Sequence, residues 1–265
     1  MVAGLQNYAV AAADSLFDLD GRVAVVTGAS SGLGAHFARV LRSRGAMVVV
    51  AGRREDRLNA LARELGTGYA EAVRADVTDE SAMVALVDRA VTRFGRLDVM
   101  VNNAGVADVG PGETESLLDF ERVIRVNLTA VFTGCREAAR VMLPAGKGSI
   151  VNIASVAGFG SLSERYPLTG YVASKAGVIG LTRELGAQWA ARGVRVNAIA
   201  PGWFPSAMTG ELSDQGQVRW IESRTPIGRA GRLEELDGVL VFLASEASSF
   251  LIGQTIAVDG GWTLW

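Results

Sequence analysis

Short apolar runs alternate with longer amphipathic stretches from residue 22 to the end of the chain. The runs are rich in β-branched residues and apolar at nearly every position, a pattern typical of strands buried on both faces. They predict strands at 22–27, 47–52, 97–102, 149–154, 194–199 and 255–259, with a weaker strand at 69–75. The amphipathic stretches predict helices at 33–44, 54–65, 79–94, 115–143, 171–191 and 232–245. Regular alternation of the two predicts an α/β fold, a doubly wound parallel sheet with helices on both faces.

Two parts of the chain fall outside this alternation. We expect residues 1–16 to be an N-terminal extension and residues 17–265 to form a single domain. Residues 202–231 mix glycine, proline and serine with large apolar side chains and predict a long loop. A loop of that length in a compact domain is usually functional, so we expect it to serve the substrate. Thr78 and Asp79 are candidate caps for the helix at 79–94.

Glycine makes up 32 of the 265 residues, about 12% of the chain against a typical ~7%. The single Cys135 excludes a disulfide framework and a cysteine-rich zinc site. The single His36 excludes a histidine cluster, so we predict no metal site. A lone histidine without a G-x-S-x-G motif also argues against a Ser-His-Asp hydrolase.

Charge and hydropathy argue against nucleic-acid and membrane partners. The 26 basic and 28 acidic side chains give a net charge of −2, and they form no basic stripe. The apolar runs are far shorter than the ~18 residues of a membrane span. The first residues lack a charged region followed by a continuous apolar run, which a secretory signal would need. We therefore expect a cytoplasmic protein.

A glycine-rich segment, T-G-A-S-S-G-L-G at residues 27–34, joins the first predicted strand to the first helix. Glycines in such a turn let the backbone approach a pyrophosphate, and the helix N-terminus offers N–H groups and a positive dipole to the phosphates. A tight turn without a ligand is the alternative interpretation. The candidate cofactor-binding residues of this segment are Gly28, Ser30, Ser31, Gly32, Leu33 and Gly34.

The end of the second predicted strand bears on the choice of cofactor. Gly52 stands about 20 residues after Gly32, where an NAD-binding fold usually has an acidic residue on the ribose 2′-hydroxyl. Here Arg53 and Arg54 follow instead, and a guanidinium suits a 2′-phosphate. The pair favours NADP(H), with NAD(H) as the alternative. Both arginines could also simply begin a solvated helix.

Further polar residues follow the ends of other predicted strands. Asp76 and Val77 come after the weak strand, and Asn103, Ala104 and Gly105 come after the next one. Ligands of open α/β sheets bind at the carboxyl edge of the strands, so both groups are candidate cofactor contacts. Asx-type turns are the alternative for each.

Tyr171 and Lys175 are four residues apart at the start of a predicted helix and therefore share one face of it. An ammonium beside a phenol favours the phenolate, so we expect Lys175 to lower the pKa of Tyr171 from ~10 toward neutrality, as a general acid/base requires. Ser155 follows the fifth predicted strand and could hydrogen-bond a substrate carbonyl. Asn127 is polar within a core-like helix, where a satisfied buried amide is the alternative.

The segment 27–34, the run from Asn102 to Gly105, Asn127, Ser155, the Tyr171/Lys175 pair and Pro201-Gly202 resemble, in this order, the short-chain dehydrogenase/reductase family. The resemblance covers the chain from about residue 17 and implies a Rossmann fold. Segments such as NAIAPGWFPSAMT and GQTIAVDGGW resemble the 3-oxoacyl-carrier-protein reductase and gluconate 5-dehydrogenase-like branches.

The resemblance implies a role for each catalytic candidate. Tyr171 would give a proton to the carbonyl oxygen in reduction and remove one in oxidation. Ser155 would orient and polarise that oxygen. Lys175 would lower the pKa of the tyrosine and bind the nicotinamide ribose, and Asn127 would hold a water in a proton relay.

The resemblance also implies the cofactor contacts. Asp76 and Val77 would contact adenine, and residues 103–105 would line the cofactor. The remaining implied contacts are Pro201, Gly202 and Ser206, the last standing where the family usually has threonine. A second departure is the spacing of 16 residues between Ser155 and Tyr171, where the family commonly has about 13. The extra residues lie in Ser161–Gly170 and put the substrate analogy in doubt.

These observations favour an NADP(H)-dependent oxidoreductase that interconverts a ketone and a secondary alcohol. The alternatives are an NAD(H)-dependent dehydrogenase of a sugar acid, sterol or other secondary alcohol, and a non-catalytic dinucleotide-binding protein. Large side chains of the loop at 202–231 suggest a partly apolar small-molecule substrate, although core or oligomer contacts would explain them equally: Trp203, Phe204, Met208 and Trp220. The resemblance further implies a homotetramer or dimer, with the helix at 232–245, the last strand and the tail at 261–265 near an interface.

Overall fold

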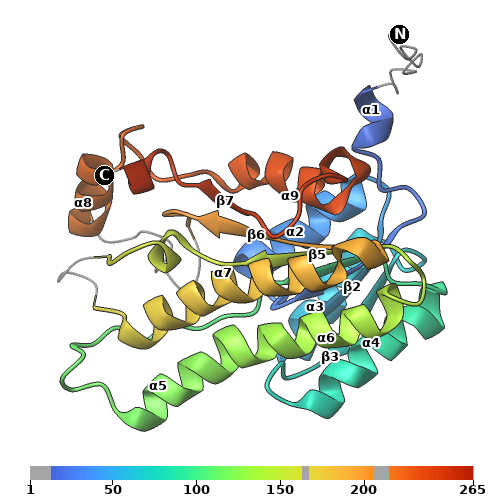
Figure 1. Cartoon of the computed structure of the whole chain (residues 1–265), viewed down its shortest axis with the longest axis horizontal. Coiled ribbons are helices and arrows are strands. Elements are labelled where there is room, and N and C mark those ends of the chain that lie inside the picture. Colours follow the sequence, from blue (N-terminus) through green and yellow to red (C-terminus); the bar gives the residue numbers. More distant parts are fainter. Residues whose placement is uncertain (1–12, 163–166, 206–214, 265) are drawn as a thin grey trace, which may run out of the picture.

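The computed structural model describes residues 13–162, 167–205 and 215–264. Its centre is a parallel sheet of seven strands in the order β3-β2-β1-β4-β5-β6-β7 (Figure 1). The strands are β1 (Val23–Thr27), β2 (Met47–Gly52), β3 (Ala70–Arg74), β4 (Val99–Asn102), β5 (Gly148–Ile153), β6 (Val194–Pro201) and β7 (Thr255–Val258). Every predicted strand is present within two residues of its expected bounds, and the predicted doubly wound α/β fold is confirmed.

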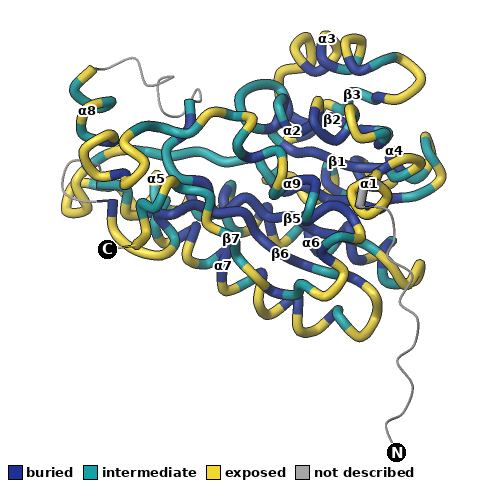
Figure 2. The backbone as a smooth tube through the Cα atoms, turned by 90° about the horizontal axis from the view of Figure 1, so that it is seen from above, coloured by how far each residue is buried: buried dark blue, intermediate teal, exposed yellow. Residues whose placement is uncertain are grey.

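Helices cover both faces of the sheet (Figure 1). One apolar cluster joins the strands to α2 (Gly32–Ser43), α3 (Glu55–Leu65) and α9 (Asp237–Ala244). A second cluster joins the other face to α4 (Glu80–Phe94), α6 (Ala130–Met142) and α7 (Thr169–Trp189). The short helices α1 (Ala13–Leu16), α5 (Leu117–Ile124) and α8 (Gln215–Arg224) contribute no buried residue to either cluster, and α5 packs against α7. Figure 2 shows the buried strands at the centre and the exposed outer turns of the helices.

The structure corrects four details of the sequence-based prediction. The helix expected at 115–143 is interrupted by a π-helical turn, Arg125–Thr129. The helix expected at 232–245 begins as a 3-10 turn, Leu233–Leu236. The stretch at 202–231, expected to be a loop, contains α8 in its described part. Only Asp79 caps α4, since its carboxylate accepts from the Ser81 and Ala82 backbone amides while the Thr78 hydroxyl donates to Asp76.

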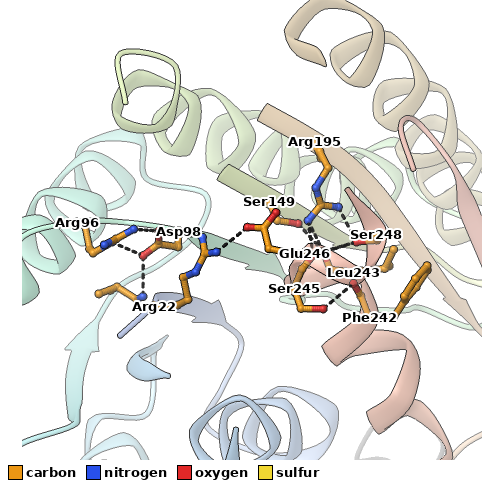
Figure 3. A network of polar contacts seen from close by, with 11 residues as sticks. Arg22, Arg96, Asp98, Ser149, Arg195, Phe242, Leu243, Ser245, Glu246 and Ser248 are labelled. Carbon is orange, nitrogen blue, oxygen red and sulfur yellow. Dashed lines mark hydrogen bonds and ion pairs between the residues drawn. The ribbon is translucent and has the colours of Figure 1, made fainter. Parts of the chain in front are cut away.

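A polar network ties the elements together at the amino ends of the strands (Figure 3). The Asp98 carboxylate is 3% exposed and accepts from the Val23 backbone amide at 2.9 Å and from the Arg96 guanidinium. It thereby holds the start of β1 beside the start of β4. Arg195 donates to the carbonyls of Leu243 and Ser245, which lie at the C-terminus of α9. A cation at this helix end also suits the helix dipole.

No helix in the described ranges is long and apolar enough to cross a membrane.

Replacement of Asp98 by alanine should lower the free energy of unfolding by about 1–3 kcal/mol, because the buried Val23 amide loses its acceptor. Urea unfolding followed by circular dichroism measures the change. The matched control is Glu64→Ala, which breaks the exposed Arg39–Glu64 ion pair and should cost at most about 1 kcal/mol. Equal losses in the two variants would contradict the anchoring role of Asp98.

Candidate active site

A cavity of about 450 Å³ opens at the carboxyl edge of the sheet, on the opposite side from the Asp98 network. It lies where β1 and β4 are neighbours and their connections leave toward opposite faces, which is where open α/β sheets bind ligands. Its described lining comprises Gly28, Ser30–Gly34, Gly52–Arg54, Ala75–Val77, Asn103–Val106, Val126, Ile153–Ser155, Tyr171, Lys175, Pro201, Gly202 and Phe204.

The glycine-rich turn forms one end of the cavity because its backbone lies directly against the loop after β4. Gly28 has a φ of +68°, and a Cβ there would lie 2.8 Å from the Ala104 Cα. The Thr27 hydroxyl accepts from the backbone amides of Asn103 at 3.0 Å and Ala104 at 3.2 Å. The Asn103 side chain donates back to the Thr27 carbonyl. These contacts hold the two loops together, at a distance that leaves no room for a side chain at Gly28.

The start of α2 suits the phosphates of a dinucleotide. Ser31 is the N-cap residue, yet its hydroxyl makes no capping bond to the helix. The amides of the first turn therefore face the cavity end with the positive pole of the helix dipole. Since the neighbouring glycines leave room for a close approach of the backbone, this cradle fits a pyrophosphate group.

Two arginines and an aspartate stand beside the cradle. Arg54 donates to the hydroxyls of Ser30 at 2.9 Å and Ser31 at 2.5 Å. The Asp76 carboxylate accepts from the amide and hydroxyl of Thr78, which lowers the pKa of Asp76, and the Arg53 charge lowers it further. This corner of the cavity thus contains two arginines after β2, the hydroxyls of Ser30 and Ser31, and one ionised carboxylate after β3.

Ser155, Tyr171 and Lys175 meet at the other end of the cavity. Ser155 follows β5 in extended conformation, and its hydroxyl accepts from the Ala157 amide at 3.1 Å. Its side chain is also hydrogen-bonded to that of Tyr171, in the first turn of α7. Lys175 lies one turn further on, with its Nζ 5.5 Å from the centroid of the Tyr171 ring. The three side chains can therefore contact one substrate oxygen and its surroundings.

The expected effect of Lys175 on Tyr171 is not what this structure shows. Burial raises the pKa of Tyr171, and the hydrogen bond with Ser155 opposes that rise. The Lys175 ammonium donates to the Ile153 carbonyl at 2.7 Å and faces the ring of the tyrosine. Burial lowers the pKa of Lys175 to about 8. Burial is therefore the dominant influence on the pKa of Tyr171 in this structure.

Asn127 lies behind the cavity wall, in the π-helical turn. Its side chain is fully buried, accepts from the Val106 amide and donates to the Val106 carbonyl, both at 2.8 Å. It also donates to the Ser174 hydroxyl on α7 at 3.1 Å. The amide thus clamps the loop after β4 to the helix of Tyr171, which is the satisfied buried arrangement that was the alternative for this residue.

A family model described as Enoyl-(Acyl carrier protein) reductase matches residues 28–263. The cis-4-hydroxycyclohexanecarboxylate dehydrogenase of Sinomonas cyclohexanicum is 44% identical over 91% of this chain and 96% of that protein. The gluconate 5-dehydrogenase of Gluconobacter oxydans is 40% identical over 94% of this chain and 97% of its own length.

A gluconate 5-dehydrogenase from Burkholderia cenocepacia, solved in complex with NADP and tartrate, superposes with a TM-score of 0.90. It is 37% identical, over 96% of this chain and 100% of that one. The chain belongs to the short-chain dehydrogenase/reductase family. This dehydrogenase/reductase is accordingly an oxidoreductase that acts on CH–OH groups with a nicotinamide dinucleotide.

The structure brings most of the predicted site residues of this dehydrogenase/reductase to the one cavity. Asn127 stands behind its wall, and Ser206 lies outside the described residues, as does part of the Ser161–Gly170 segment. The roles of all these residues stay predictions.

Several lining residues escaped the sequence analysis, namely Ala75, Val106, Val126, Ile153, Ala154 and Phe204. Phe204 was considered for the substrate but not for the cofactor cavity. Ile153 ends β5 and Ala154 follows it, so the rule that ligands bind at the carboxyl ends of strands could have found them. Val126 carries no such signal, because it depends on the π-helical turn.

The lowered pKa of Lys175 predicts a pH dependence of stability. Between about pH 8 and pH 10.5, Lys175 is protonated in the unfolded chain and uncharged in the folded chain. The free energy of unfolding should therefore rise with pH over this range. The rise is about 1.4 kcal/mol per unit of pKa difference. Urea unfolding of wild type and Lys175→Met at pH 8 and pH 10 should show a smaller rise in the variant.

The control is Lys147→Met, which removes the chain's other lysine at an exposed position and should keep the wild-type rise. An identical rise in all three proteins would contradict the burial of an uncharged Lys175 amine.

Proposed function

We propose that this dehydrogenase/reductase interconverts a ketone and a secondary alcohol with NADP(H), using Tyr171 as general acid/base. The observation that carries the proposal is the hydrogen-bonded Ser155–Tyr171 pair, with Lys175 one turn further along α7, at the end of a cavity whose other end is a phosphate cradle. The proposed reacting groups and the proposed cofactor cradle thus share one cavity of about 450 Å³.

The chain's own residues handle the oxygen and its proton. In reduction, the Tyr171 hydroxyl donates its proton to the carbonyl oxygen, while the Ser155 hydroxyl orients that oxygen. In oxidation, the alcohol proton passes to Tyr171. Asn127 serves by holding the loop after β4 against α7. The bound nicotinamide supplies the hydride acceptor or donor for the substrate carbon.

Retention of the proton at neutral pH suits Tyr171 to the reductive direction. Because burial raises its pKa, the phenol is protonated and can serve as the acid without prior activation. In the oxidative direction the tyrosine must lose that proton first, and alkaline pH supplies the driving force.

NADP(H) is preferred in this proposal because Arg53 and Arg54 follow β2 where an NAD-specific site would have an acid. Both arginines line the cavity, and the Arg54 guanidinium donates to the Ser30 and Ser31 hydroxyls. The relative solved with NADP supports the same cofactor. NAD(H) remains the alternative, since the Asp76 carboxylate stands in the same corner.

We further propose a homo-oligomer that uses the outer edge of β7 and the neighbouring α9. The residues of β7 are half-buried or exposed, unlike those of the inner strands. The tail was expected to pack on a neighbour, but Trp262 packs on Trp203 and Trp220 of its own chain. Leu264, which is 75% exposed, is the described tail residue left for such a contact.

Tyr171→Phe should lower kcat by at least about 10²-fold, because the proton donor of the reaction is removed. NADPH affinity, measured by fluorescence titration, should stay within twofold, since the ring and Lys175 remain. Tyr69→Phe, at a 52% exposed tyrosine, is the control and should leave kcat unchanged. Undiminished turnover in Tyr171→Phe would overturn the assignment.

Arg53→Ala should raise the KM for NADPH by about 10-fold or more and leave that for NADH nearly unchanged, since only the former has a 2′-phosphate for the charge-assisted bond. Steady-state kinetics with each cofactor measures the change. Arg57→Ala, an exposed arginine of α3 outside the cavity lining, should change neither KM. Equal losses for NADPH and NADH would count against a 2′-phosphate site at Arg53.

A further inference from the structure

The short 3-10 turn that follows β5 carries Ser155 at its start. This turn, Val156–Gly158, has Ser155 as its N-cap residue. Two hydrogen bonds tie the serine to the turn. Its hydroxyl accepts from the Ala157 amide at 3.1 Å, and its carbonyl accepts from the Gly158 amide at 2.9 Å. The position of the Ser155 hydroxyl therefore depends on the position of the turn.

Gly158 is the point at which this turn lies against α7, the helix of Tyr171. A Cβ on Gly158 would lie 2.7 Å from the Ile179 Cδ1 and 2.8 Å from the Lys175 carbonyl oxygen. Both distances are below 3.0 Å, which real Cβ atoms essentially never show, so a side chain would force the turn and the helix apart. Because the carbonyl oxygen belongs to the helix backbone, a change of rotamer cannot relieve that contact.

The turn, rather than the helix, would move if a side chain stood at Gly158. The helix α7 has 21 residues, and its buried side chains belong to the second apolar cluster. Lys175 is held separately, since its Nζ donates to the Ile153 carbonyl at 2.7 Å. The turn has only three residues. Its displacement would therefore carry Ser155 away from Tyr171 while Tyr171 and Lys175 keep their places.

We propose that Gly158 is a positioning residue for the reaction. By letting the turn pack directly on the backbone of α7, it sets the distance between the Ser155 hydroxyl and the Tyr171 hydroxyl. The inference rests on the proposed function and adds to it a residue that acts through Ser155. Gly158 itself is not part of the described lining of the cavity, so its effect on the reaction is indirect.

Gly158→Ala in the full-length protein, with saturating NADP⁺, should lower kcat by about 10²-fold, the scale of loss when a reacting group is misplaced by about an ångström. The probe is whichever of cyclohexanol, 2-propanol and D-gluconate the wild type oxidises fastest. The affinity for NADPH, measured by fluorescence titration, should stay nearly unchanged, because the phosphate cradle lies at the other end of the cavity.

Gly160→Ala is the matched control, two residues further along the same loop. A Cβ on Gly160 would meet no heavy atom within 4 Å in the described part of the chain, so this variant should keep the wild-type kcat.

The pH dependence of oxidation separates displacement of Ser155 from general damage to the fold. The hydrogen bond with Ser155 opposes the rise that burial causes in the pKa of Tyr171. Loss of that bond should raise the pKa further, so the rising part of the plot of kcat against pH should move to higher pH in Gly158→Ala. Gly160→Ala should keep the wild-type profile. An unshifted profile in Gly158→Ala would overturn the inference.

A double-mutant cycle tests whether Gly158 acts through Ser155. Ser155→Ala already lacks the hydroxyl, so the addition of Gly158→Ala to this variant should lower kcat by less than about threefold more. Losses that multiply in the double variant would show a separate structural role and would count against positioning of Ser155.

Ile179→Val provides a milder version of the test, which also serves if Gly158→Ala does not fold. Valine lacks the Cδ1 atom that the new Cβ would meet at 2.7 Å, and only the contact with the Lys175 carbonyl remains. The kcat of Gly158→Ala/Ile179→Val should lie above that of Gly158→Ala and clearly below that of Ile179→Val. Equal kcat in the double variant and in Ile179→Val would contradict the proposal.

The wild type distinguishes failure of this inference from failure of the proposed function. If the wild type transfers hydride and Gly158→Ala keeps its kcat, the positioning role is wrong and the proposed function stands. If the wild type transfers no hydride from any secondary alcohol, both are wrong.

Discussion

The contact between the loops that follow β1 and β4 is the constraint on which the site depends. One hydroxyl, that of Thr27, accepts two backbone amides of the facing loop, and the absence of a Cβ at Gly28 permits the approach. Any side chain at Gly28 would push the loops apart. The glycine-rich turn and the loop after β4, which both line the cavity, are therefore fixed by the same few atoms at the centre of the sheet edge.

Asn127 links this loop contact to the end of the cavity where Ser155 and Tyr171 lie. Its amide binds both polar atoms of the Val106 backbone and reaches Ser174, which lies next to Lys175 on α7. The glycine-rich turn, the loop after β4 and the tyrosine helix thus form one connected unit. A buried polar chain of this kind is costly unless every member is paired, so it specifies a single arrangement. Pairing of Asn127 by protein groups accounts for its burial in an otherwise apolar layer.

The fold and the cavity edge could be predicted from the sequence because both produce a local sequence pattern. Strands buried on both faces read as continuous apolar runs, and a parallel sheet gathers its loops at one edge. The π-helical turn at Arg125–Thr129 produces no such pattern, because its residues suit an α-helix equally. Contacts between distant segments, such as Trp203 with Trp262, are invisible to periodicity.

The environment of Tyr171 could not be predicted for a related reason. Spacing shows that Lys175 is near the phenol, but it does not show that burial raises the pKa of Tyr171.

The π-helical turn constrains how the length of this chain can change in evolution. A π-turn accommodates one residue more than an α-turn, so the segment behaves as an α-helix that has accepted an insertion. Deletion of a residue there would restore regular geometry and rotate Asn127 away from Val106 and Ser174. A surface loop can change in length at little cost in free energy. A change in length within this helix would instead break the hydrogen bonds of Asn127. Length variation among relatives of this protein should therefore be scarce between α5 and α6 and concentrated in the loops.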